Sequence, residues 1–125
     1  MQQLATKKTN DKTKMNSTPN PAGARTSYQT VPLNGVDIFY REAGQPGQPA
    51  VLLLHGFPTS SHMFRELIPA LAAEYHVIAP DYPGFGYSSA PEAARFDYTF
   101  DRLSEITESF LKKIGVTRFA LFMQD

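Results

Sequence analysis

The chain has 125 residues and a formal net charge of zero, with 42% hydrophobic and 19% charged residues, which is ordinary for one small folded domain. Because it contains no cysteine, it can form no disulfide framework, thiolate metal site or cysteine nucleophile. It also lacks an apolar run of about 18 residues and a secretory signal, so we expect a cytoplasmic protein without a membrane partner.

The charge is unevenly distributed along the chain. Residues 1–28 carry five basic side chains and one acidic side chain, and the remainder carries seven basic and eleven acidic side chains. The first 27 residues contain no aromatic residue and few large aliphatic residues, so they bury too little apolar surface to offset their ordering entropy. We therefore expect residues 1–27 to form a disordered basic tail, in preference to a nucleic-acid or membrane contact or a transit peptide.

Ordered structure is expected over residues 28–125. The runs 28–33 and 36–41 are joined by Asn34-Gly35, which predicts a β-hairpin with a type I′ turn. The continuous apolar run at 51–54 predicts a strand that is buried on both faces and therefore lies centrally in a sheet.

Two amphipathic helices alternate with further strands in the rest of the chain. The expected elements are a helix at 59–74, a strand at 76–79, a loop at 80–91, a helix at 100–114 and a strand at 118–124. Pro69 predicts a kink or a restart inside the first helix. Thr99 and Gly115 suit the start and the end of the second helix.

The order of these elements predicts an α/β fold with a mostly parallel sheet and an antiparallel N-terminal hairpin. Ligands bind such sheets beyond the carboxyl ends of the strands. The sequence His55-Gly56-Phe57-Pro58 (HGFP) stands at one of these ends. Gly56 and Pro58 together would hold a backbone N–H in a fixed direction, as an oxyanion hole requires, or would form a plain strand-to-helix turn.

A loop rich in glycine follows the next predicted strand. Asp81 can accept backbone N–H bonds there, and Gly84 and Gly86 allow a tight path. The loop has only two of the three glycines of G-x-G-x-x-G and leads into no helix directly. The chain also contains no GxxxxGK[ST] pattern, so we do not expect nucleotide binding.

Asp125 follows the last predicted strand. Its carboxylate is either delivered to a site or merely the polar end of an apolar strand. The two remaining histidines, His62 and His76, are interpreted as solvated or packed surface residues, because one lies in a first helical turn and the other at the far end of the sheet.

Taken together, HGFP, APDYPGFGYS and FMQD after successive strands resemble the N-terminal half of an α/β-hydrolase-fold enzyme over residues 28–125. Within that fold, the chain most resembles the branch of epoxide hydrolases and haloalkane dehalogenases, in which an aspartate stands where esterases carry the serine of G-x-S-x-G. The resemblance implies that Asp125 is the nucleophile and that the Phe57 N–H is an oxyanion donor, with a cis peptide bond before Pro58. The supporting residues that it implies are His55, Gly56, Pro58, Asp81, Gly84 and Gly86.

The implied reaction is attack of an aspartate on the electrophilic carbon of a small apolar substrate, followed by hydrolysis of the ester by water and a His–acid pair. No cofactor, metal or nucleic acid is implied. Phe57 favours an epoxide hydrolase, because dehalogenases of this type usually carry a halide-binding Asn there. The alternatives are a haloalkane or haloacid dehalogenase, a serine-type ester hydrolase in which Asp125 is out of register with the true elbow, and a non-catalytic interaction module.

In enzymes of this type the elbow helix, the cap domain, the acid and the catalytic histidine all follow the nucleophile strand. We therefore expect the chain to be a truncated fragment that is inactive alone. We also expect its unpaired edge strand and uncovered apolar faces to favour aggregation.

Overall fold

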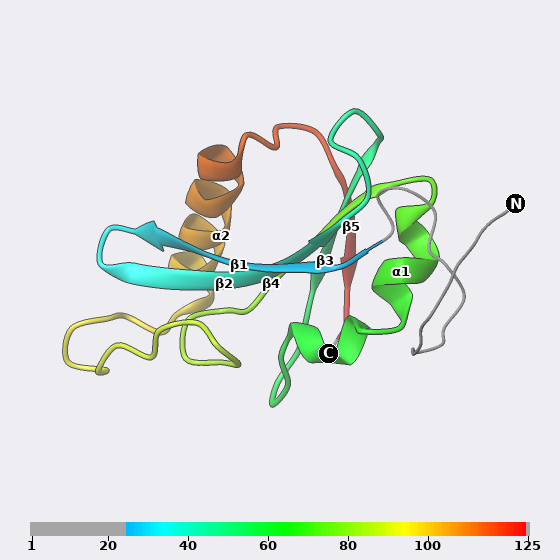
Figure 1. Cartoon of the computed structure of the whole chain (residues 1–125). Helices are drawn as coiled ribbons and strands as arrows, with labels where there is room; N and C mark the ends of the chain where they lie inside the picture. Colours follow the sequence, from blue (N-terminus) through cyan, green and yellow to red (C-terminus); the bar gives the residue numbers. More distant parts are fainter. Residues whose placement is uncertain (1–24, 125) are drawn as a thin grey trace, which may run out of the picture.

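A computed structural model describes residues 25–124 (Figure 1). Most of the expected basic tail and Asp125 therefore lie outside the described residues. The elements are β1 (Ser27–Leu33), β2 (Val36–Ala43), β3 (Ala50–Leu54), the 3₁₀ helix η1 (Ser61–Phe64), α1 (Leu67–Ala72), β4 (His76–Pro80), α2 (Phe100–Ile114) and β5 (Ala120–Met123). No helix among the described residues is long and apolar enough to cross a membrane.

The five strands form one sheet in the order β1-β2-β4-β3-β5. The β1–β2 and β2–β4 pairs are antiparallel, and β3 pairs in parallel with both β4 and β5. This arrangement confirms the predicted α/β fold with an antiparallel hairpin at its start. It also confirms the central place of β3, whose continuous apolar sequence is buried from Leu52 to Leu54.

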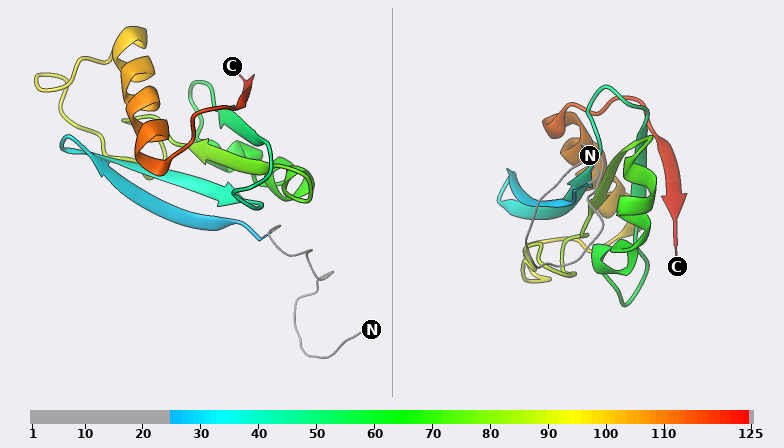
Figure 2. Two further views of the ribbon diagram at one scale, coloured as in Figure 1. Left: turned by 90° about the horizontal axis from the view of Figure 1, so that it is seen from above. Right: turned by 45° about the vertical axis from the view of Figure 1, so that its right-hand side comes forward.

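The helices α1 and α2 lie on opposite faces of the sheet (Figure 2). An apolar cluster lies between the sheet and each of them. Leu52, Leu54 and Ile78 pack on the side of α2, against Ile106 and Phe110. The alternating residues of the same strands pack on the side of α1, and these are Leu53, Val77 and Ala79. Side chains of a strand point alternately to its two faces, so residues 52–54 of β3 and 77–79 of β4 must all be apolar to serve both clusters.

The local signals at the hairpin and at the second helix are confirmed. Asn34 and Gly35 both have positive φ, as a type I′ turn requires. The Thr99 hydroxyl accepts the N–H of Arg102 at the start of α2, and Gly115 ends the helix in the left-handed conformation.

The helix predicted at 59–74 restarts, as expected, and forms two separate elements, η1 and α1, but the place of the restart differs from the prediction. The break lies at Arg65 and Glu66, before Pro69 rather than at it. A proline inside an α-helix clashes with the carbonyl of the residue four positions earlier, here Arg65, and cannot donate a hydrogen bond to it. A helix that contains Pro69 therefore begins after Arg65. Pro69 itself is the third residue of α1, where a missing N–H removes no helical hydrogen bond.

β5 is shorter than the predicted strand at 118–124 and forms an edge of the described sheet. Its large side chains are Leu121, Phe122 and Met123, and they are 52%, 45% and 63% exposed. Within residues 25–124, the sheet therefore has the uncovered apolar edge that the sequence led us to expect.

His62 is exposed as predicted, but the surface assignment of His76 is wrong. His76 is buried, and its Nε2 lies 2.6 Å from Oε2 of Glu42. The reason is that β2 lies beside β4 and presents a carboxylate to it, which the sequence alone did not indicate.

Candidate functional site

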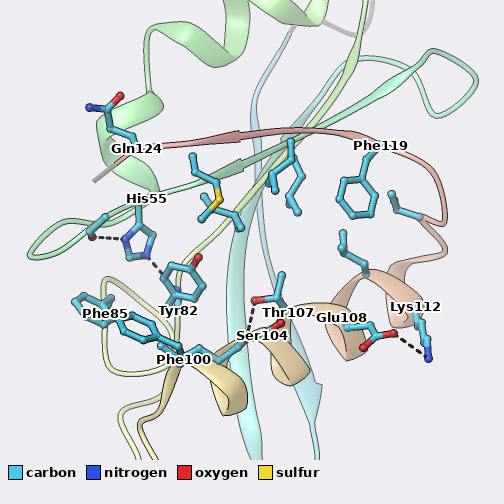
Figure 3. Close-up of a pocket in the computed structure, with 18 of the residues that line it drawn as sticks. His55, Tyr82, Phe85, Phe100, Ser104, Thr107, Glu108, Lys112, Phe119 and Gln124 are labelled. Atoms are coloured by element: carbon cyan, nitrogen blue, oxygen red, sulfur yellow. Dashed lines mark hydrogen bonds and ion pairs between the residues drawn. The ribbon is translucent and has the colours of Figure 1, made fainter.

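The carboxyl ends of β3, β4 and β5 meet at one edge of the sheet, since the three strands are parallel. Leu54 is paired with Met123, and the N–H of Gln124 donates to the Leu54 carbonyl over 3.1 Å. Gln124 and His55 therefore lie at the same end of the sheet (Figure 3). The residues that follow them, Phe57 and Asp125, were the two predicted to act together; Asp125 itself lies outside the described residues.

The HGFP loop turns sharply at the end of β3. The peptide bond between Phe57 and Pro58 is cis, as predicted. The Gly56 carbonyl accepts the N–H of Thr59 at 3.2 Å and the Thr59 hydroxyl at 2.8 Å. The Phe57 side chain is 75% exposed, and among residues 25–124 no acceptor pairs with its backbone N–H. The Phe57 N–H is thus a free backbone donor at the strand end.

His55 joins this loop to the one that follows β4. The backbone N–H of Tyr82 donates to His55 Nε2 over 3.1 Å, and His55 Nδ1 lies 2.8 Å from the Gly56 carbonyl oxygen. The side chain is almost fully buried, with its ring against the rings of Tyr82 and Phe85. Burial lowers the pKa of His55, although the Gly56 hydrogen bond and the nearby Asp81 carboxylate oppose that shift. His55 is therefore held neutral, with both ring nitrogens occupied.

Asp81 organises the glycine-rich loop by accepting backbone N–H bonds, as predicted. Its Oδ1 accepts the N–H of Ser61 at 2.7 Å, and its Oδ2 accepts the N–H of Tyr87 at 2.9 Å. Only 1% of the residue is exposed. Gly86 has φ +53°, and a Cβ there would lie 2.0 Å from Asp81 Oδ2, so the loop needs glycine at this position.

Gly84 likewise adopts a positive φ of +88° in this loop. The loop is anchored to β2 by Ser88, whose hydroxyl accepts the Phe39 N–H and donates to the Asp81 carbonyl. The loop does not lead directly into a helix, since α2 begins at Phe100. This geometry agrees with a shaping role and not with a phosphate-binding turn.

An apolar groove of about 1130 Å³ runs from the strand ends along the face of the sheet beside α2. His55, Tyr82 and Phe85 lie at one end, and Glu108 and Lys112 lie on α2 along its lower wall (Figure 3). Burial raises the pKa of the Tyr82 hydroxyl, which therefore stays protonated at neutral pH. Described residues include no cluster of three or more His, Asp or Glu side chains that would hold a metal.

Ser61, Arg41 and Thr59 are among the residues of this site that the sequence did not indicate. Ser61 donates its N–H to Asp81, and its hydroxyl oxygen accepts the Nε–H of the buried Arg41 over 2.8 Å. Thr59 holds the Gly56 carbonyl. A hydroxyl residue three positions after a turn glycine is a local signal that would have identified Thr59. Arg41 and Ser61 are 20 residues apart, so only the fold reveals their contact.

Comparison with known proteins places the chain in a family. Residues 49–122 match the model of the alpha/beta hydrolase fold family. An uncharacterized hydrolase of Saccharomyces cerevisiae is 50% identical over 92 residues, which are 74% of this chain and 31% of that protein. Epoxide hydrolase A of Mycobacterium tuberculosis is 47% identical over 89 residues, which are 70% of this chain and 27% of that protein.

A solved structure shows the same likeness in three dimensions. The haloalkane dehalogenase of Bradyrhizobium elkanii, in a loop-variant form, matches with a TM-score of 0.74 and 34% identity, over 80% of this chain and 32% of that one. The chain thus spans about a third of the length of the proteins it matches. From the family match and these likenesses we conclude that the chain belongs to the alpha/beta hydrolase fold family and is related to epoxide hydrolases and haloalkane dehalogenases.

Proposed function

We propose that the protein hydrolyses small apolar epoxides through an aspartyl ester, with Asp125 as the nucleophile and the Phe57 N–H as an oxyanion donor. One observation carries the proposal: the Gln124 N–H bonds to the Leu54 carbonyl, so the strand that leads to Asp125 ends beside the strand that leads to Phe57. A nucleophile and a fixed donor can act on one group only when the chain delivers both to the same place.

The chemistry runs in two steps. A carboxylate oxygen of Asp125 bonds to an epoxide carbon, the carbon–oxygen bond of the ring breaks, and the ring oxygen takes up a proton. Water then attacks the carbonyl carbon of the ester, and the Phe57 N–H stabilises the oxyanion formed there. Collapse of this intermediate releases the diol, which keeps the carboxylate oxygen that attacked it, while an oxygen from water stays on Asp125.

The second step needs a base to activate water, and His55 does not supply it, because both of its ring nitrogens are occupied. The resemblance implies a His–acid pair in that role. The proteins named as epoxide hydrolase and haloalkane dehalogenase support an epoxide or a haloalkane as the substrate class. Phe57 supports the epoxide over the haloalkane, because the dehalogenases usually place a halide-binding Asn there.

A single turnover in heavy-oxygen water tests the proposal. The intact protein, expressed from the full reading frame of its gene, is mixed in excess with a small aryl epoxide, and the peptide that contains Asp125 is weighed. We expect one heavy oxygen in that peptide and none in the first diol released. Asp125→Asn should form no ester, while Asp97→Asn, a matched change at an exposed aspartate, should behave as wild type.

The same assay separates the other functions. Heavy oxygen in the diol, with none in the Asp125 peptide, would refute the aspartyl ester. Faster turnover of a terminal haloalkane would identify a dehalogenase, and turnover of a carboxylic ester that survives Asp125→Asn would identify a serine-type esterase. Loss of all turnover in a folded intact protein would favour an interaction module.

A further inference from the structure

The Gly56 carbonyl oxygen receives three hydrogen-bond contacts. Thr59 supplies two of them, through its N–H at 3.2 Å and its hydroxyl at 2.8 Å. His55 Nδ1 supplies the third at 2.8 Å. A carbonyl oxygen has two lone pairs, so a third donor fills the space around it and leaves little freedom to rotate.

The plane of that peptide unit also contains the Phe57 N–H. Because the peptide bond is planar, and trans between Gly56 and Phe57, the carbonyl and the N–H point in opposite directions. Any group that fixes the direction of the Gly56 oxygen therefore fixes the direction of the Phe57 N–H as well. The three contacts on the Gly56 oxygen thus orient the Phe57 N–H on the opposite side of the peptide unit, and no acceptor among residues 25–124 bonds to that N–H.

The state of the His55 ring follows from its partners. A backbone N–H can only donate, so the Nε2 that receives the Tyr82 N–H carries no proton. The ring proton is then on Nδ1, from where it donates to the Gly56 oxygen. Asp81 is the charged group that faces this ring, and Tyr82 contributes a hydroxyl that stays protonated. If the ring bound a second proton, Nε2–H and the Tyr82 N–H would both be donors facing each other. The hydrogen bond between the HGFP loop and the loop after β4 would then be lost.

We propose that His55, as the neutral ring with its proton on Nδ1, and Thr59 are positioning residues that hold the Gly56–Phe57 peptide so that the Phe57 N–H points at the reacting group. The catalytic consequence rests on the proposed function, whereas the ring state does not. The effect of both side chains passes through the peptide plane.

Thr59 offers the cleanest substitution, because Thr59→Val removes the hydroxyl and keeps the shape, and Thr59→Ser keeps the hydroxyl. In the intact protein, Thr59→Val should lower kcat for the epoxide about tenfold, since small displacements of a catalytic donor cost up to roughly a hundredfold. KM should change by less than about twofold, because the donor acts on a charge that forms only during the reaction. Thr59→Ser should restore kcat. Equal kcat in wild type and Thr59→Val would overturn the proposal.

Nitrogen NMR of the intact protein labelled in its histidine rings provides a readout that needs neither substrate nor a variant. We expect the His55 ring to carry its proton on Nδ1 at neutral pH and to correlate with the Tyr82 amide across the hydrogen bond. A ring protonated on Nε2 overturns the proposal even if the enzyme turns over epoxides. If no epoxide is turned over but the ring has its proton on Nδ1, the proposed function fails and the positioning of the peptide stands.

Discussion

Replacement of Asp81 by Asn should loosen the loops at the ends of β3 and β4. Both carboxylate oxygens act as acceptors, for the Ser61 N–H at 2.7 Å and the Tyr87 N–H at 2.9 Å. An Asn side chain has one acceptor oxygen and one NH₂ group. Whichever way the amide turns, its NH₂ faces either the buried Ser61 N–H or the part-buried Tyr87 N–H, and that donor loses its acceptor.

The magnitude follows from those two contacts. A buried donor left without a partner costs about 1–3 kcal/mol, and bonds to an ionised acceptor are roughly twice as strong as neutral ones. We therefore expect the variant to lower the free energy of local opening by about 2–4 kcal/mol. Since about 1.4 kcal/mol corresponds to a factor of ten, amide exchange in the two loops should accelerate between roughly 30-fold and 700-fold.

Hydrogen exchange of the intact protein, followed at the Ser61 and Tyr87 amides, measures this effect directly. The matched control is Asp37→Asn, the same change at an exposed aspartate, which should alter exchange by no more than about twofold. If Asp81→Asn behaved like this control, the carboxylate would not be what holds the two loops, and the reasoning would be refuted.

Three further predictions concern the loop, the second helix and pH. Gly86→Ala should destabilise the protein in urea by about 3 kcal/mol, because its Cβ would lie 2.0 Å from Asp81 Oδ2; Gly35→Ala, also at positive φ but with no neighbour within 4 Å, should cost only about 1 kcal/mol. Thr99→Ala should cost about 1 kcal/mol by removing the cap of α2, and Thr99→Ser should recover most of it in the same titration. The pKa of His55 is lower in the folded state than its unfolded value near 6.5, so the unfolded state binds the proton first as the pH falls. The contribution of neutral His55 to the free energy of unfolding is therefore present above about pH 6.5 and is lost as the pH falls toward the folded pKa. A His55→Gln variant that lost as much stability in acid as the wild type would contradict this reasoning.

The elements that the sequence predicted well depend on local chemistry. Asn34-Gly35 requires positive φ wherever the hairpin lies, and Thr99 caps α2 through an N–H three residues away. The elements it predicted poorly depend on neighbours in space. The His76–Glu42 contact joins residues 34 apart, across the antiparallel pairing of β2 with β4, and nothing within either segment indicates it.

The candidate site divides in the same way. Parallel strands bring their carboxyl ends together, so the positions of His55, Gly56 and Asp81 at one edge followed from the order of the elements alone. The tie from His55 to Tyr82 and the bond from Ser61 to Asp81 depend on β3 lying beside β4. The pairing of β3 with β4 depends on packing at both faces of the sheet, and no sequence motif indicates it.

Beyond the ends of β3 and β4, side chains serve as acceptors for several backbone N–H groups. His55 Nε2 receives one N–H, and the Asp81 carboxylate receives two more. Each of these donors is thereby withdrawn from the edge of the sheet, while the Phe57 N–H remains without an acceptor among residues 25–124. A backbone donor that serves a ligand must be free and must not move, and the contacts on the Gly56 carbonyl meet the second condition for the Phe57 N–H. His55 therefore has two effects: its Nε2 ties the HGFP loop to the loop after β4, and its Nδ1 holds the Gly56 carbonyl, whose direction sets that of the Phe57 N–H.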